Sequence, residues 1–101
     1  MMRDARTFLA AHLPVTRLVE ARSLPARTGT RVHLKVESEL PTGSLKVRGA
    51  LWALARRLEA GPVAEVVASS TGNHGAAVAW AAHRLGGRAT IFLPAEPNAV
   101  Q

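Results

Sequence analysis

The sequence predicts an α/β fold that contains a strand-helix-strand unit with two parallel strands. Apolar runs at residues 63–68 and 89–94 lie on either side of a helical pattern from Gly75 to about Leu85. Apolar runs of this length are typical of strands buried on both faces of a parallel sheet, and a helix between two such strands makes a right-handed crossover. Residues 95–101 look like the loop and first turn of another helix, so we expect an incomplete sheet.

The first third of the chain is expected to hold a short helix and a hairpin. Residues 3–12 have helical composition, and Pro14 ends the segment because proline cannot continue a helix. Residues 16–20 and 31–37 alternate apolar and polar side chains on either side of the turn-rich residues 25–30. This pattern predicts two antiparallel strands joined by a turn.

An amphipathic helix is expected between the hairpin and the parallel unit. Ser44 is a natural N-cap, because its hydroxyl can accept a hydrogen bond from an early helical amide, and the helix begins at about Leu45. Apolar residues then recur at spacings of four, three and four, which predicts one packing face made of Val47, Leu51, Leu54 and Leu58. Gly61-Pro62 ends this helix, and Gly86-Gly87 ends the next one.

Composition and charge limit the kinds of partner that this protein is expected to bind. The chain has 101 residues, 48% of them hydrophobic, and a formal net charge of +6. Its eleven arginines are scattered, and only two tryptophans and two phenylalanines accompany them, so no nucleic-acid partner is expected. A basic binding module ranks last among the candidate functions. The alternative is an arginine-rich solvated surface, balanced by acidic residues elsewhere in a larger protein.

The sequence also argues against disulfides, metal sites, membrane spans and a signal peptide. The absence of cysteine excludes disulfides and thiolate metal sites, and His12, His33 and His83 lack a metal-ligand spacing, so we expect no metal. No apolar run is long enough to span a bilayer, and the N-terminal residues lack the apolar core of a signal peptide. We therefore expect a soluble, cytoplasmic protein without a membrane partner.

Lys46 is the first candidate site residue. The chain has only two lysines, Lys35 and Lys46, and the second lies at the start of a predicted helix. An amine near the positive end of the helix dipole is disfavoured as an ammonium ion and is a better nucleophile, which suits carbonyl chemistry. Gly49, Ala50 and Ala53 follow on the same side of the helix, and such small side chains would let a flat ligand approach.

A second candidate site is the polar loop between the first parallel strand and its helix. Ligands gather at the carboxyl ends of parallel strands, and exposed amides at a helix start bind anions. Ser70 and Thr71 offer hydroxyls, Gly72 permits close backbone approach, and the Asn73 amide can bond to a phenolate oxygen. His74 is expected to cap or pack rather than to act as a general base. We expect this loop and Lys46 to face one site.

These two segments resemble motifs of the fold-type II pyridoxal phosphate enzymes, which have the tryptophan synthase β-like fold. Residues 44–50 match the pattern Ser-x-Lys-x-Arg-Gly-Ala, and residues 70–74 match Ser-x-Gly-Asn-His. The sequence Gly-Asn-His-Gly is similar to the threonine and serine dehydratase and serine racemase branch, since cysteine synthases usually show Gly-Asn-Thr. Residues 34–37, 41–43 and 91–94 also look like this branch. The resemblance implies that residues 1–101 are the N-terminal portion of a catalytic domain whose remainder is absent.

The resemblance also implies a cofactor, a reaction and a role for each site residue. Lys46 would form the Schiff base with pyridoxal 5′-phosphate and would then move the α-proton of the substrate. Asn73 would hydrogen-bond the ring hydroxyl oxygen of the cofactor. The residues expected around the substrate carboxylate are Ser70, Thr71, Gly72, Asn73 and His74. The implied reaction is elimination of water from a small hydroxy amino acid, which yields a 2-oxo acid and ammonia, in a full-length protein expected to be a homo-oligomer.

The sequence departs from the family pattern in three respects. Leu45 stands where a phenylalanine commonly packs on the cofactor, and Thr71 stands where racemases carry a serine that serves as the second acid/base. The glycine-rich phosphate loop of the family does not occur in these 101 residues. We therefore expect the isolated chain to bind the cofactor weakly, and a non-catalytic remnant or half of a split enzyme is the alternative to a working lyase.

Overall fold

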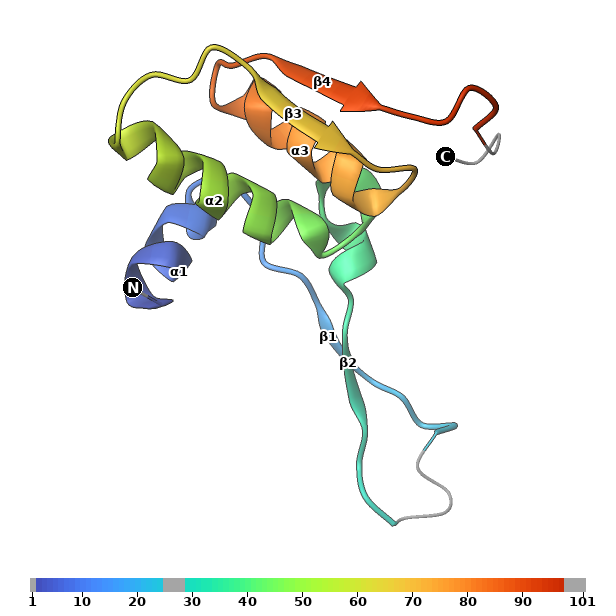
Figure 1. Ribbon diagram of the computed structural model, residues 1–101. Helices are drawn as coiled ribbons and strands as arrows, with labels where there is room; N and C mark the ends of the chain where they lie inside the picture. The colour runs from blue at the N-terminus through green and yellow to red at the C-terminus, as the bar shows by residue number, and fades with distance from the viewer. Residues whose placement is uncertain (1, 25–28, 98–101) are drawn as a thin grey trace.

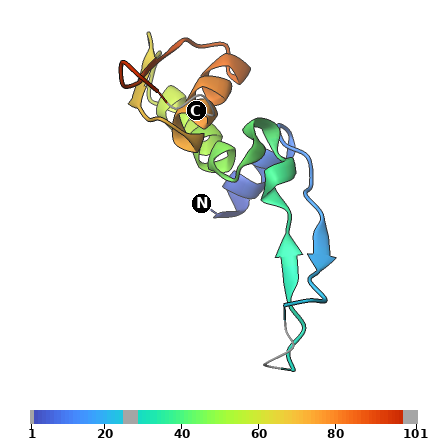
Figure 2. The same cartoon turned by 90° about the vertical axis from the view of Figure 1, so that its right-hand side faces the viewer.

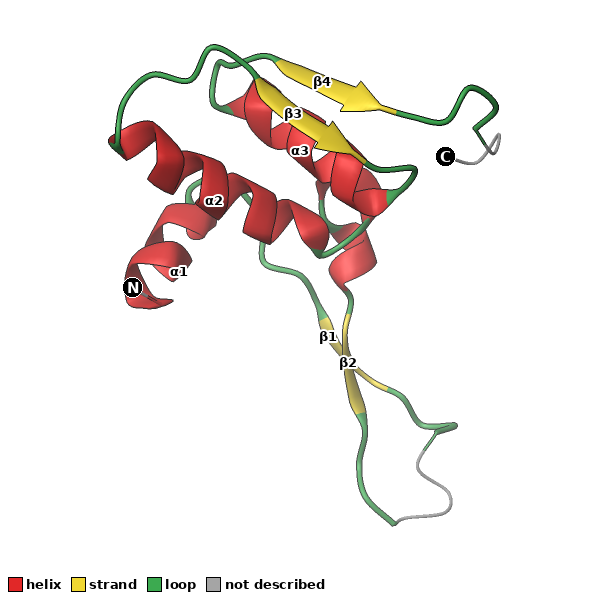
Figure 3. Cartoon of the chain, in the orientation of Figure 1, coloured by secondary structure: helices red, strands yellow, loops and turns green. Residues whose placement is uncertain are grey.

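The computed structural model describes residues 2–24 and 29–97, and its architecture is α/β, as predicted. The helices and strands in chain order are α1 (Met2–Ala10), β1 (Leu18–Glu20), β2 (His33–Lys35), α2 (Lys46–Glu59), β3 (Val66–Ser69), α3 (Asn73–Arg84) and β4 (Ala89–Phe92). Two short 3-10 helices, η1 (Glu37–Glu39) and η2 (Pro41–Gly43), join β2 to α2. Figures 1 and 3 show α3 under the β3–β4 pair, α2 beside α3, and α1 against α2.

The strand-helix-strand unit is present as predicted. β3 and β4 are parallel, in a register that runs from Val66 opposite Ala89 to Ser69 opposite Phe92. α3 connects the two strands and packs against both of them. The carboxyl end of β3 therefore leads directly into the N-terminus of α3, which is the place where the sequence predicts a ligand loop.

The two parallel strands are shorter and less covered than the apolar runs 63–68 and 89–94 predict. The ladder begins at the Val66 amide, which bonds to the backbone of the residue before β4 at 2.9 Å, so the residues ahead of Val66 have no partner strand. Val67 is 59% exposed and Phe92 is 60% exposed. One face of this sheet is thus open in the described part of the chain, although the sequence predicts burial on both faces.

The predicted hairpin is confirmed. β1 and β2 are antiparallel, with Leu18 opposite Lys35 and Glu20 opposite His33. The strands cover less than the predicted ranges 16–20 and 31–37, and residues 25–28 of the predicted turn lie outside the described residues. Figure 2 shows the hairpin extending away from the helices, and among the described residues its base is the part that lies beside them.

The core lies between α1, α2 and α3. Val47 and Leu51 are fully buried, as the four-three-four spacing predicts, and Leu54 is partly buried beside them. Ala77 and Ala81 of α3 are also buried in this cluster. Alanines at this interface let the axes of α2 and α3 approach closely, because little side-chain volume separates the two backbones. Among the described residues, no helix has both the length and the hydropathy needed to cross a membrane.

The start of α2 follows the predicted capping geometry. Ser44 is extended (φ −150°, ψ 164°), and its Oγ accepts a hydrogen bond from the Lys46 amide at 3.2 Å. Leu45 already has helical dihedrals (φ −65°, ψ −17°), although the helical hydrogen-bond pattern begins at Lys46. The hydroxyl of Ser44 thus satisfies one of the free amides at the helix start, next to the candidate nucleophile.

Other helix boundaries differ from the predicted ones. α3 begins at Asn73 rather than Gly75, because the Gly72 carbonyl already accepts the Ala76 amide at 3.2 Å and starts the helical ladder. α1 covers residues 2–10 rather than 3–12, since the chain tightens into a turn after Ala10. The end of α3 is as predicted: Gly86 has φ 78°, a left-handed conformation that costs glycine little and ends the helix.

A tight turn precedes α2 and was not predicted in detail. Thr42 has φ 69° and ψ 0°, which is rare for a β-branched residue and costs on the order of 1–2 kcal/mol. The turn is held by the Gly43 amide, which donates to the Leu40 carbonyl at 2.8 Å, and by the Leu40 side chain, which is 3% exposed. The buried leucine and this bond offset the strain and direct the chain into α2.

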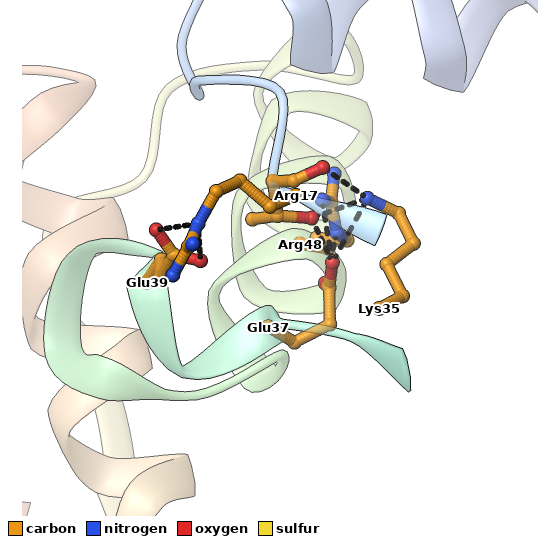
Figure 4. A network of polar contacts seen from close by, with 6 residues as sticks. Arg17, Lys35, Glu37, Glu39 and Arg48 are labelled. Carbon is orange, nitrogen blue, oxygen red and sulfur yellow. Dashed lines mark hydrogen bonds and ion pairs between the residues drawn. The ribbon is translucent and has the colours of Figure 1, made fainter. Parts of the chain in front are cut away.

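The Glu37 carboxylate joins the hairpin to α2 (Figure 4). Arg48, in the first turn of α2, donates to Oε2 from Nε at 2.6 Å and to Oε1 from a terminal nitrogen at 3.1 Å. The Thr16 hydroxyl donates to Oε1 at 2.6 Å, and Lys35 Nζ lies 3.4 Å from the same oxygen. The Glu37 side chain is only 20% exposed, so these charge-assisted bonds are partly shielded from water and salt.

These donors lower the pKa of Glu37 to about 2, with the Arg48 hydrogen bonds as the largest cause and the Thr16 hydroxyl next. The carboxylate in turn raises the pKa of Arg48. A neighbouring pair, Arg17 Nε to Glu39 Oε1 at 2.8 Å, is more exposed. Because the pKa of Glu37 is lower in the folded than in the unfolded chain, its ionisation stabilises the fold above the unfolded value.

Glu37→Gln should reduce the free energy of unfolding of the natural protein by about 1–3 kcal/mol near neutral pH. The deficit should be complete above the unfolded pKa of 4.5 and should shrink as pH falls from there toward about 2, where the folded carboxyl takes up its proton. Urea unfolding of both proteins at neutral and acidic pH measures this. Glu39→Gln, which removes the exposed pair, should cost less than about 1 kcal/mol. A pH-independent deficit for Glu37→Gln would contradict the prediction.

Gly75→Ala should reduce stability by about 1–3 kcal/mol, because a Cβ at this position would lie 3.0 Å from Ile91 Cγ2 and 3.1 Å from the Ser70 carbonyl oxygen. The matched change Gly49→Ala should instead raise stability by about 0.5–1 kcal/mol, since it lies inside α2 with no atom within 4 Å of the added carbon. Denaturant unfolding of the natural protein measures both. Equal effects of the two changes would show that α3 does not pack on Ile91 and Ser70 as described.

Candidate active site

The two lysines have different surroundings. Lys35 Nζ donates to the Thr16 carbonyl oxygen at 3.3 Å, bonds to the Thr16 hydroxyl and pairs with Glu37. The Lys46 amine has no hydrogen-bond or ion-pair partner among the described residues, and its side chain is exposed. Lys46 is therefore the lysine that is available to a carbonyl compound.

A pocket of about 640 Å³ lies beside Lys46, between α2, β3 and α3. Its α2 wall contains Gly49, Ala50 and Ala53, the small residues that the sequence places beside Lys46. Nothing lies within 4 Å of a Cβ added to Gly49, so the wall is open as well as flat. The remaining lining residues come from all three elements and the loop before β3: Leu54, Arg57, Val63, Glu65, Val66, Val67, His74 and Val78.

The second motif lies at the same end of the molecule. In Figure 1, α2 and α3 run in the same direction, so their N-termini, which carry Lys46 and Asn73, lie at one end of the helix pair. η2, directly ahead of the Lys46 segment, contacts α3. His74 and Lys46 line the same pocket, which brings the two predicted loops to one site.

The structure does not place all predicted site residues in the pocket wall. Ser70, Thr71, Gly72 and Asn73 form the loop and helix start beside His74, but they do not line the pocket itself. Ser70 Oγ accepts the Gly72 amide at 3.2 Å, which shapes the turn between β3 and α3. The first amides of α3 have no helical acceptor and are available to an anion.

These features fit the cofactor that the sequence resemblance implies. A free amine suits attachment to a carbonyl group, a small-residue wall suits a flat ring, and a helix start suits an anionic group. Lys46 and the residues of the β3–α3 loop are the groups that would hold it. The described residues would therefore supply an attachment point and one side of a site for a flat ring.

Sequence patterns did not predict the carboxylate that holds Arg48. An ion-pair role for Arg48 is the expected one for an arginine at this position, but its partner Glu37 lies eleven residues earlier and reaches it only because of η1. Lys35 is the last residue of β2, and Glu37 lies two residues later at the start of η1. This close spacing of opposite charges is the one local signal that Lys35 and Glu37 act together.

The chain is similar to known proteins over most of its length. Residues 9–99 match the family described as pyridoxal-phosphate dependent enzyme. A putative threonine dehydratase of Sinorhizobium fredii is 45% identical over 89 residues, which are 88% of this chain and 27% of the relative. The L-serine dehydratase/L-threonine deaminase of Homo sapiens is 39% identical over 85 residues, which are 84% of this chain and 26% of the relative.

A solved structure shows the same fold. The crystal structure of a pyridoxal 5′-phosphate-dependent aspartate racemase matches with a TM-score of 0.89 and 33% identity, over 98% of this chain and 32% of that chain. The chain thus spans about a quarter to a third of the length of these three proteins. Because the family match covers nearly all of the sequence, the chain belongs to the pyridoxal-phosphate dependent enzyme family, whose cofactor is pyridoxal phosphate.

Proposed function

We propose that the protein containing these residues is a threonine/serine ammonia-lyase, which converts a small hydroxy amino acid into a 2-oxo acid and ammonia. The names of the bacterial and human relatives support this reaction class. The observation that carries the proposal is the Lys46 amine, which has no partner among the described residues, beside a pocket with a wall of small side chains. Bound pyridoxal phosphate supplies an electron sink that makes the α-proton of an attached amino acid acidic.

Lys46 has two tasks in this proposal. Its amine would hold the cofactor through the carbonyl group of the cofactor. The same amine would accept the α-proton of the bound amino acid. Both tasks require an amine that no carboxylate holds, and among the described residues this condition distinguishes Lys46 from Lys35.

The β3–α3 loop binds the substrate carboxylate in this proposal. The Ser70 and Thr71 hydroxyls and the first amides of α3 are donors gathered at one helix start, where the dipole also favours an anion. The Asn73 amide lies in the first turn of α3 and would donate to the ring oxygen of the cofactor. His74 lines the same pocket as Lys46 and would help to enclose the substrate.

Racemisation is a second candidate, favoured by the TM-score of 0.89 with the aspartate racemase structure. Both reactions begin with removal of the α-proton, but racemisation also needs an acid on the opposite face of the α-carbon. Thr71 is the side chain at the position where the family resemblance places that acid. Racemases of the family carry a serine at that position and this chain does not, so elimination is the better supported reaction.

Trapping with borohydride should identify Lys46 as the attachment residue. We expect reduction of the natural protein with bound pyridoxal phosphate to fix the cofactor on Lys46, because Lys35 is held by Thr16 and Glu37. Trypsin does not cut after a modified lysine, so the label should appear on the peptide 36–48. Mass spectrometry of the digest measures this.

A label on the peptide 32–46, which would contain modified Lys35, would contradict the proposed attachment. Lys46→Ala provides the control: it should remove both the label and the visible absorbance of the bound cofactor. Lys35→Arg retains a cation for Glu37 and should leave the label on the peptide that contains Lys46.

Asn73→Ala should shift the visible absorbance of the bound cofactor and slow formation of 2-oxo acid from threonine or serine by about 10-fold or more, because the proposed hydrogen bond to the ring oxygen is lost. Asn73→Asp is the matched change of equal size, and its negative charge next to a phenolate oxygen should slow the reaction further. Product analysis for 2-oxo acid and for D-amino acid separates elimination from racemisation. An unchanged spectrum in both variants would exclude the assigned contact.

A further inference from the structure

The first turn of α2 places three consecutive residues in three environments. Val47 is fully buried, Arg48 pairs with Glu37, and Lys46 lies at the pocket. Successive residues of an α-helix are about 100° apart around its axis, so Arg48 lies about 160° from Lys46 by the shorter way. A contact on Arg48 therefore acts on the side of the helix nearly opposite to Lys46.

We propose that Glu37 is a positioning residue for Lys46 and that it acts through Arg48. This inference rests on the proposed function of Lys46. Val47 in the core resists translation of the helix away from its neighbours, and the two bonds from Arg48 to Glu37, at 2.6 and 3.1 Å, resist rotation about the helix axis. Together they set the direction in which the Lys46 side chain leaves the helix.

The Glu37 carboxylate is itself held from several sides. The Leu40 amide donates to the Glu37 carbonyl at 3.2 Å, and the Leu40 side chain is buried, so η1 is anchored in the core. The Thr16 hydroxyl and Lys35 ammonium both bind Oε1, whereas Oε2 faces Arg48 Nε. An anchored carboxylate with a fixed orientation can transmit the position of the hairpin base to α2.

A small rotation of α2 is enough to change the position of the Lys46 amine. The side-chain surface of a helix lies about 5–6 Å from its axis, so a rotation of about 20° moves the end of a side chain by about 2 Å. A misplacement of about 1 Å can slow a reaction by about 10²-fold. A small loss of restraint at Arg48 is thus amplified at the Lys46 amine while the hydrophobic core stays in place.

A neighbouring ion pair offers a matched control. Glu39 also lies in η1 and also takes a two-bond arginine contact, from Arg17 Nε at 2.8 and 3.2 Å. Arg17 precedes β1, so this pair joins η1 to the hairpin and does not reach α2. Glu37→Gln and Glu39→Gln are the same chemical change in the same segment, and only the first removes a restraint on Lys46.

The test measures the rate at which Lys46 takes up pyridoxal phosphate in the natural protein after the cofactor has been removed. The rate is followed by visible absorbance and by timed borohydride trapping on the peptide 36–48, and denaturant unfolding of each variant confirms that it is folded. We expect Glu37→Gln and Arg48→Lys each to slow attachment by about 10-fold or more, and Glu39→Gln to change it by less than about twofold. Glu37→Gln should add nothing further in an Arg48→Lys background.

Three other results would each contradict a specific claim of this proposal. Equal attachment rates in Glu37→Gln and Glu39→Gln, with reduced stability in the first, would make Glu37 a purely structural residue and overturn the inference. Additive effects of Glu37→Gln and Arg48→Lys would overturn action through Arg48. If Glu37→Gln does not fold, Glu37→Asp, which keeps the charge on a shorter side chain, takes its place with the same expected slowing. An unlabelled Lys46 in the unaltered protein would overturn the proposed function as well.

Discussion

The bidentate pair between Glu37 and Arg48 is the interaction on which the geometry of the site depends. It joins the base of a projecting hairpin to the first turn of α2, two segments that share few other contacts. Both partners are partly buried, so loss of either one leaves a poorly solvated charge and costs more than the pair itself contributes. The hairpin base and the helix that carries Lys46 are consequently fixed relative to one another.

Small side chains have two different effects in this fold, and their neighbours decide which. Ala77 and Ala81 face α2, where their small volume brings two helices together and buries Leu51. Gly49 and Ala53 lie on another side of α2 and line the pocket, and nothing lies within 4 Å of a Cβ added to Gly49, so the same lack of volume leaves space there. One helix therefore packs through one face and offers a ligand wall along another, and the register between these faces follows from the helical period.

Sequence patterns predicted the structural features that depend only on residues close together in the chain. The apolar spacing around Leu51, the hydroxyl of Ser44 at the helix start and the glycine stop at Gly86 each depend on residues within one or two turns. The parallel unit also followed from pattern and length. By contrast, the pairing of Glu37 with Arg48 and Thr16 depends on contacts 11 and 21 residues apart, and no periodicity encodes it. Thr42 adopts a backbone conformation that its own propensity disfavours, because the buried Leu40 next to it decides the turn.

The two lysines differ in their partners, and this difference decides which of them is available as a nucleophile. The chain has thirteen lysines and arginines but only seven acidic residues. A basic side chain without an acidic partner is therefore expected and does not by itself identify a functional residue. Arginine, however, does not lose its proton in proteins and cannot attack a carbonyl group, which leaves only the two lysines as candidate side chains. Glu37 and Thr16 hold Lys35 in a network at the hairpin base, while Lys46 has no described partner and lies at a pocket. The carboxylate that fixes the direction of Lys46 through Arg48 thus also removes its only lysine competitor.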